Sequence, residues 1–149
     1  MERKELIAMA DQRVRLIRAE HHLTQDKMAA VLGLSKKTLV EIEKGRTSLG
    51  WTGTVALCAI FSGSEVLKNA CGGDPQSLVQ ALAFEKPPLH PVPTMGGPVW
   101  WNDVHEDCGY RIQQNILSHH YRLLDPQNNR LCSSFDLEAV EKFLAECMQ

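Results

Sequence analysis

The sequence predicts an all-α N-terminal part and a small α+β C-terminal module, joined by a proline-rich linker. Three observations predict this fold class. Two short helical patterns meet at one glycine within residues 24–45, five of the seven prolines fall within residues 86–98, and residues 110–116 alternate in polarity as a strand does. Because proline lacks a backbone N–H, the linker is not expected to join a helix or a sheet. The expected divisions are a domain over residues 1–84, the linker over 85–98 and the module over 99–149.

Two short helices are predicted on either side of Gly33. Thr24 is a good N-cap for a helix that begins at Gln25, because its hydroxyl can accept a hydrogen bond from a free backbone amide. Gly33 ends this helix, since the left-handed conformation costs least without a Cβ. Ser35 then caps a second helix, which Gly45 closes. The side chains that these helices turn inward are Met28, Ala29, Leu32, Leu39 and Ile42.

Three more helices complete a predicted five-helix domain. Residues 2–22 carry a helical apolar stripe, and Ser64 can cap a short helix that ends before a glycine pair. Residues 51–61 are expected to form a buried helix. Residues 74–84 predict one further helix that trails the five, with proline in its first turn. The apolar positions expected to face inward in the helix over residues 51–61 are Val55, Leu57, Ala59 and Ile60.

The pattern from Gln25 to Gly45 resembles the helix-turn-helix of Cro and phage-repressor-type regulators. The packing positions follow the family spacing without a gap, and the segment from Glu43 to Arg46 is similar to the family's acidic-x-Gly-basic ending. The resemblance covers about residues 10–70. It implies a compact all-α bundle that binds double-stranded DNA. It also implies a buried ion pair between Arg18 and Glu43, and an exposed Arg18 is the alternative.

In this family the second helix of the motif enters the major groove by its N-terminal half, so Lys36 and Lys37 are the expected base-edge readers. Each lysine can equally contact a phosphate. Glu41 can accept a hydrogen bond from cytosine, or pair with Lys37 one turn earlier. Gln25 is expected to contact a phosphate from the first helix. The remaining DNA-contact candidates are Ser35 (foremost a cap), Thr38, Lys44 and Arg46.

The charge of the chain is unevenly distributed. Its formal net charge is -2, yet residues 1–72 carry eleven basic and eight acidic side chains, a net charge of +3. Residues 73–149 carry five basic and ten acidic side chains, a net charge of -5. Because DNA responds to the local field, the basic N-terminal half is the half expected to face it.

The C-terminal module is expected to contain about three antiparallel strands and a helix. The strands are predicted over residues 110–116, 119–124 and 130–133, and Ser134 or Asp136 caps the helix. Trp100 and Trp101 are expected to cover the sheet or to line an effector pocket. A module this small often gains stability by pairing with a copy of itself, so we expect a homodimer.

Composition excludes several classes of protein. No apolar run approaches the roughly 18 residues of a membrane span, and no signal-peptide core follows the charged start, so a cytoplasmic protein is expected. No nucleophile–base or phosphate-loop motif predicts an enzyme, and no cofactor is expected. The candidate ligands of a metal site are His105, Cys108, His119, His120 and Cys132, but their spacing matches no zinc template.

The sequence therefore predicts a dimeric, sequence-specific transcription regulator, most simply a repressor, that binds a palindromic DNA site with half-sites about 34 Å apart. One alternative is an antitoxin-like protein that binds a basic partner and also regulates its own promoter. A third hypothesis is a metal- or redox-responsive switch that uses the five cysteines and the histidines.

Overall fold

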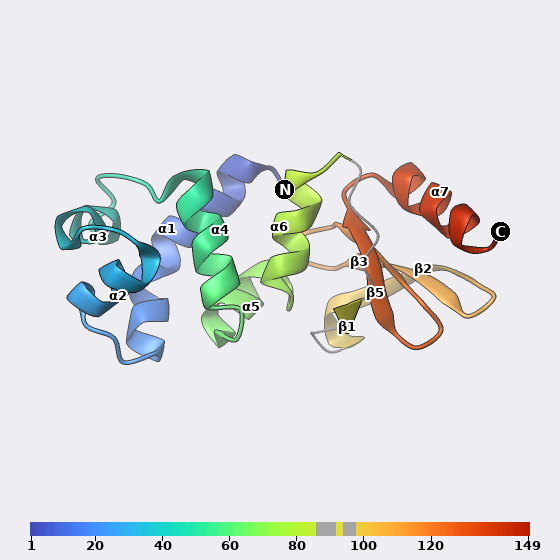
Figure 1. Cartoon of the computed structure of the whole chain (residues 1–149), viewed down its shortest axis with the longest axis horizontal. Helices are drawn as coiled ribbons and strands as arrows, with labels where there is room; N and C mark the ends of the chain where they lie inside the picture. Colours follow the sequence, from blue (N-terminus) through green and yellow to red (C-terminus); the bar gives the residue numbers. More distant parts are fainter. Residues whose placement is uncertain (86–91, 94–97) are drawn as a thin grey trace. The chain divides into compact units, whose positions relative to one another are not determined.

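The computed structural model describes residues 1–85, 92–93 and 98–149. The chain divides into two compact units, Met1–Ala70 and Cys71–Gln149. The first unit is helical, and the second combines helices with an antiparallel sheet (Figure 1). No helix among the described residues is long and apolar enough to cross a membrane.

The first unit is built from short helices around one apolar core. Helix α1 spans Arg3–Glu20, α2 spans Gln25–Leu32, α3 spans Lys36–Glu43, α4 spans Gly50–Ile60, and α5 spans Glu65–Cys71 and ends at the unit boundary. The fully or almost fully buried apolar side chains of these helices include Leu6, Ala10, Val14, Ile17, Met28, Ala29, Leu39, Ile42, Leu57 and Leu67.

Local chemistry sets the bounds of α2 and α3. The backbone amide of Lys27 donates to Thr24 Oγ1 at 3.2 Å, and that of Thr38 donates to Ser35 Oγ at 3.1 Å. Gly33 stops α2 with a φ of +71°, a left-handed conformation that favours glycine. The bounds of both helices therefore follow from the cap and glycine positions seen in the sequence.

Helix α4 lies where the sequence predicts it, but the prediction of its buried face is right at Leu57, which is fully buried, and wrong at Ala59 and Ile60. Ala59 is exposed and Ile60 is 50% exposed, whereas Thr54 is fully buried and donates through Oγ1 to the Gly50 carbonyl at 2.8 Å. The physical reason is that this segment is apolar on almost every side. Its pattern therefore gives no preferred face, and only packing against α1 selects one.

The second unit is organised around a four-stranded antiparallel sheet. Its strands are β2 (Trp101–Asp107), β3 (Tyr110–Asn115), β4 (Tyr121–Leu124) and β5 (Asn129–Ser134), and they pair in the order β5-β4-β3-β2. The two-residue strand β1 (Val92–Pro93) pairs with β5 at the other edge, and a short 3-10 helix (Pro98–Trp100) precedes β2.

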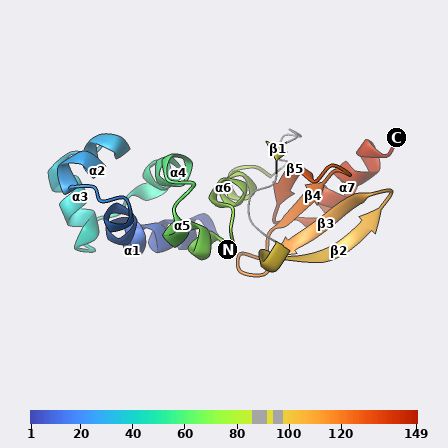
Figure 2. The same ribbon diagram turned by 90° about the horizontal axis from the view of Figure 1, so that it is seen from below.

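Two helices cover opposite faces of this sheet, as Figures 1 and 2 show for α6 (Pro75–Ala83) and α7 (Leu137–Cys147). The face under α7 is apolar. Its buried cluster contains Ile112, Leu123, Cys132, Val140 and Leu144, one or two from each packed element. This face supplies the hydrophobic core of the second unit.

The face under α6 is polar although it is buried. Ser77 Oγ on α6 lies 3.0 Å from His120 Nε2 and 2.5 Å from Ser133 Oγ. Arg130 Nη1 donates to Gln80 Oε1 at 2.6 Å. Such a layer is tolerated only where hydrogen bonds replace those lost from water, so these contacts fix how α6 lies on the sheet.

His120 makes the second unit sensitive to acid. Burial, together with nearby arginines, lowers the pKa of its imidazole to about 3, so the folded protein holds it neutral. Below an unfolded pKa of about 6.5 the unfolded chain binds a proton that the folded chain does not, and stability falls until about pH 3.

We expect the second unit to lose about 2 kcal/mol between pH 7 and pH 5 through this residue alone. Chemical denaturation at the two pH values measures the loss. His120→Gln should remove most of the difference, whereas His119→Asn, at an exposed left-handed position (φ +62°), should keep it. An equal pH dependence in all three proteins would contradict the assignment.

The structure differs from the predicted divisions at the helix after Gly73. The sequence places residues 74–84 in the N-terminal domain, but α6 packs on β5 and lies within the second unit. The described residues contain seven α-helices, which is the total that the sequence predicts. The difference lies in the unit to which the sixth helix belongs. The grouping depends on a sheet surface that the sequence of α6 does not reveal.

The predicted three strands are present as β3, β4 and β5, but β2 is a strand that the sequence pattern misses. Apart from Trp101, every residue of β2 is exposed, so it shows no buried alternation. Its turn to β3, Cys108-Gly109, has positive φ at both residues, as in a type I′ hairpin, without the usual Asn-Gly signature. Gln113 and Asn115 on β3 are buried as well. Gln113 hydrogen-bonds to Asp103 and Arg122, and Asn115 Nδ2 donates to the Gly72 carbonyl at 2.6 Å.

The expectation that the proline-rich linker joins no sheet is wrong at Val92 and Pro93, which pair with Arg130 and Asn129. An edge strand tolerates proline because one side of it needs no donor. The rest of the predicted linker, residues 86–91 and 94–97, lies outside the described residues.

Candidate DNA-binding surface

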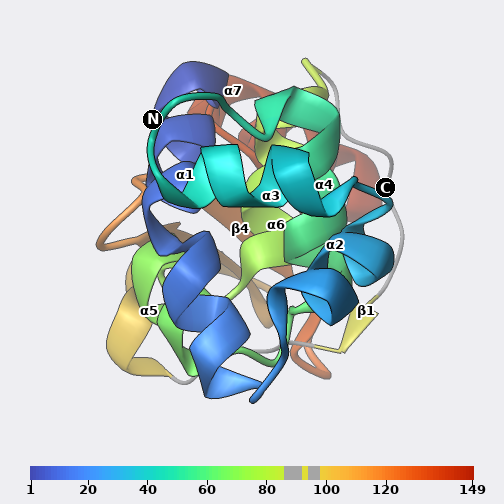
Figure 3. The ribbon, with the colours of Figure 1, turned by 90° about the vertical axis from the view of Figure 1, so that its left-hand side faces the viewer.

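The candidate surface lies on α3, the helix that carries both predicted base readers. Lys36 and Lys37 occupy its first turn and are exposed, whereas Leu39 and Ile42 point inward and are buried. In Figure 3 α3 lies in front of the other helices of its unit, with α2 beside it. The first turn of α3 is therefore exposed on the surface of the first unit.

The two lysines differ in their surroundings. Lys36 Nζ lies 3.1 Å from Asp26 Oδ2 at the start of α2, and both side chains are more than half exposed. The side chain of Lys37 makes no ion pair or hydrogen bond with the described residues. An exposed ion pair is worth about 0–1 kcal/mol, so Lys36 can exchange Asp26 for a phosphate at small cost.

Two polar residues of α3 are engaged locally. Ser35 Oγ accepts from the Thr38 amide and lies 2.8 Å from Thr38 Oγ1. Both side chains therefore serve the helix cap first, and the Thr38 hydroxyl has a partner within the protein. To contact DNA, these hydroxyls have to make a second hydrogen bond while they keep those of the cap.

The end of α3 carries a second ion pair. Glu41 Oε1 lies 3.5 Å from Arg46 Nη1, so Glu41 pairs with the arginine that follows the helix rather than with Lys37. Lys44, the C-cap of α3, is exposed. Lys36 and Arg46 are thus paired with carboxylates. Among the described residues of this surface, Lys37 and Lys44 have no carboxylate partner.

Beneath the motif, Arg18 and Glu43 are joined by two hydrogen bonds. Arg18 Nε donates to Glu43 Oε1 at 2.6 Å and Nη2 donates to Oε2 at 3.2 Å, and a third bond runs from Nη1 to the Leu23 carbonyl at 3.1 Å. The Glu43 side chain is only 6% exposed. This network ties α1 to the end of α3.

Gln25 belongs to the same network. Its Nε2 donates to Glu43 Oε2 at 2.9 Å, so the side chain predicted to reach a phosphate is directed toward α3. Burial raises the pKa of the Glu43 carboxyl, but the hydrogen bonds from Arg18 and Gln25 outweigh burial and lower its pKa overall. Glu43 therefore stays ionised, and its hydrogen bond with Gln25 links the first residue of α2 to the last residue of α3.

Sequence reasoning missed Asp26 as the partner of Lys36. The two residues are ten positions apart on different helices, so no helical spacing rule connects them. The acidic residue in the first turn of α2 is explained equally well by the helix dipole. Only the crossing of α2 and α3 brings the two side chains together.

The candidate ligands of a metal site are not brought together. Among the described residues no three His, Cys, Asp or Glu side chains converge in a way that could hold a metal ion. His120 faces Ser77 of α6, whereas Cys132 packs in the cluster under α7, on the other face of the sheet.

Residues 14–50 match a family model described as Helix-turn-helix, from the middle of α1 to the start of α4. These residues are thus similar to the helix-turn-helix of Cro and phage-repressor-type regulators. Helix-turn-helix domains of this kind are found in DNA-binding transcription regulators, where the first helix of the motif supports the second, the recognition helix. The helices at these two positions here are α2 and α3. Comparison with curated proteins and with solved structures found no match.

Proposed function

We propose that this protein is a sequence-specific transcription regulator that acts in the cytoplasm as a homodimer, most simply as a repressor. The observation that carries the proposal is the exposed first turn of α3, with Lys36 and Lys37 on the recognition helix of a helix-turn-helix. A repressor needs no further chemistry, because occupying a promoter is enough to block it.

In the proposed complex the N-terminal half of α3 enters the major groove. Lys37 donates to a base edge or a phosphate, and Lys36 does so after releasing Asp26. Because the Gln25 side chain is held by Glu43, we assign the phosphate contact of α2 to the free backbone amides at its N-terminus. Lys44 and Arg46 add positive charge nearby.

A single helix-turn-helix makes few base contacts, which is why we propose two copies on a palindromic site. The second unit is our candidate for holding the dimer or for receiving a protein partner or small effector. Its own apolar core under α7 and its polar layer under α6 make it a folded module rather than an extension of the helical unit.

Unbiased selection of genomic or random DNA fragments by the full-length protein tests the proposal. We expect enrichment of a palindrome with half-sites about one helical turn apart, and a steep loss of affinity with salt, about 0.9 logarithmic units per phosphate contact. Enrichment of no motif, or binding that is insensitive to salt, would overturn it.

A further inference from the structure

Strand β2 forms a long free edge of the sheet in the second unit. One side of it pairs with β3 from Trp101 to Asp107, and no strand among the described residues pairs with its other side. Six of its seven residues are exposed. An exposed edge presents unpaired backbone donors and acceptors, so it is a surface to which another extended segment can add.

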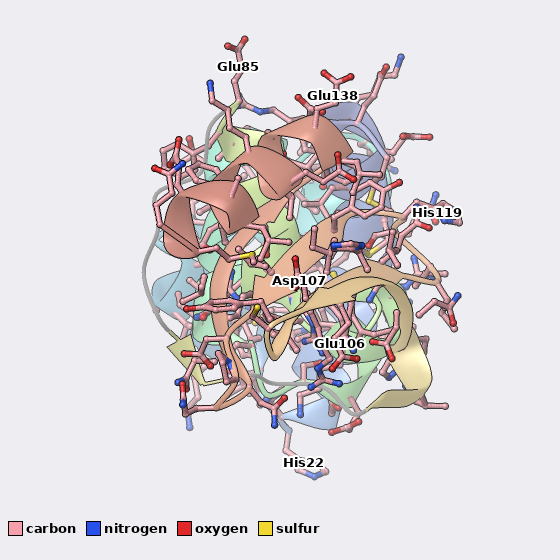
Figure 4. The ribbon with its side chains drawn as sticks, turned by 90° about the vertical axis from the view of Figure 1, so that its right-hand side faces the viewer. His22, Glu85, Glu106, Asp107, His119 and Glu138 are labelled. Atoms are coloured by element: carbon pink, nitrogen blue, oxygen red, sulfur yellow. The ribbon has the colours of Figure 1, made fainter. Side chains whose placement is uncertain are left out.

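This edge is acidic. Asp103, Glu106 and Asp107 are exposed on β2, and Figure 4 labels Glu106 and Asp107 there. The described part of the second unit has eight exposed carboxylates in all, at Glu85, Asp103, Glu106, Asp107, Asp136, Glu138, Glu141 and Glu146.

Burial of arginines makes the surface of this unit more negative than its composition indicates. Arg122 and Arg130 are each 4% exposed and are directed into the polar layer and against Trp101. Among the described residues of the unit, Lys142 is then the one lysine or arginine in the exposed class, and Arg111 is partly exposed. A partner for the β2 edge is therefore expected to be basic.

A second copy of β2 is a poor occupant of this edge. The register shifts between Asp103 and His105, so β2 contains a bulge at Val104. A bulge twists an edge and disrupts continuous pairing with an identical strand, and two acidic strands repel each other. A basic segment has no such repulsion and can pair with the regular stretch that follows the bulge.

Apolar contacts are available at the start of the same edge. Val104 is 44% exposed, and Ile116 is 45% exposed where its amide donates to the Trp100 carbonyl at 2.9 Å. Val99, next to Trp100, is 75% exposed. A segment that alternates basic and small apolar side chains would therefore meet both the carboxylates and the apolar positions.

We propose that the β2 edge binds an extended, lysine- or arginine-rich segment of a partner protein by strand addition. The backbone pairing supplies much of the affinity, and Glu106 and Asp107 select for positive charge. Asp103 has a structural task as well, because it accepts from Gln113 Nε2 at 2.7 Å, and Gln113 in turn accepts from Arg122 Nε at 2.9 Å. The proposal does not depend on DNA binding by the first unit.

The test uses the full-length protein and a fluorescent synthetic peptide of alternating lysine and valine, with anisotropy as the readout. The variant E106Q/D107N should weaken binding about twofold to fivefold. Glu106 and Asp107 are consecutive and lie on opposite faces of the strand, so the lysines of the peptide, which share one face, meet one of the two carboxylates. The control E141Q/E146Q removes the same charge from exposed positions on α7 and should bind the peptide as the wild type does.

Two further measurements test whether the peptide binds at β2 and binds there as an added strand. Amide NMR shifts on peptide addition should be concentrated in β2, and a lysine–valine peptide interrupted by proline should bind far more weakly. Equal weakening in both variants, undiminished binding of the proline peptide, or shifts spread away from β2 would overturn the proposal. So would self-association through β2, detected as a dimer that E106Q/D107N strengthens.

Discussion

Replacing Lys36 and Lys37 together by alanine is expected to reduce operator affinity at least a hundredfold for a dimer. Each lysine that reads a base is worth about 1–3 kcal/mol, and each protomer loses two positive groups from the recognition helix. Of the single changes, Lys37→Ala should have the larger effect, because Lys36 is already paired with Asp26. Mobility-shift titration of the selected operator over a range of salt concentrations measures both effects.

The control for this experiment is Lys142→Ala, which removes an exposed lysine of α7 from the second unit. It should leave affinity and salt dependence unchanged. The double variant should also lower the salt slope by about 0.9 for each phosphate that is no longer neutralised by a lysine. Unchanged operator affinity in the double variant would mean that α3 does not touch the duplex.

Replacing Arg18 by alanine is expected to destabilise the first unit by about 3 kcal/mol. The change leaves the carboxylate of Glu43, 6% exposed, with Gln25 as its remaining hydrogen-bond donor. It also frees the Leu23 carbonyl in the turn before α2. Urea denaturation followed by circular dichroism measures the loss, and Lys27→Ala, which removes an exposed cation from α2, should change stability by about 0.5 kcal/mol or less.

Acid should reduce the difference in stability between the wild type and Arg18→Ala. Because the pKa of Glu43 is lowered in the folded protein, its ionised form contributes stability above the unfolded pKa of about 4.3, and that contribution is lost as the pH falls through the folded pKa. The wild type should therefore lose more stability than Arg18→Ala between pH 5 and pH 3. A gap between the two proteins that is constant with pH would show that the ion pair is not the source of the effect.

The helices of the helix-turn-helix were predictable because their signals are local. Thr24, Gly33 and Ser35 each act within a few residues of themselves, through a cap hydrogen bond or a left-handed φ. Buried and exposed positions of α3 follow the same logic, since Leu39 and Ile42 lie one turn apart. The partners of the predicted DNA-contact residues were less predictable, because Lys36 and Gln25 each pair with a residue of another helix.

The second unit was less predictable because its pattern depends on both faces of a sheet. Gln113, Asn115 and His120 are polar yet buried, and their hydrogen-bond partners lie on other segments. His120 contacts Ser77 of α6, Asn115 donates to the Gly72 carbonyl, and Gln113 accepts from Arg122 of β4. Strand β2 shows the reverse case, in which an element with almost no buried side chain is held by its backbone pairing to β3.

By itself the sequence determined the helix-turn-helix, its caps and the basic character of its surface, because these depend on residues adjacent along the chain. The tertiary structure decided that α6 belongs to the sheet, that Lys36 is paired while Lys37 is open, and that β2 is a free acidic edge. The physical reason is that hydrogen bonds, ion pairs and burial between distant segments exist only once the elements pack, and no spacing along the chain encodes which ones will meet.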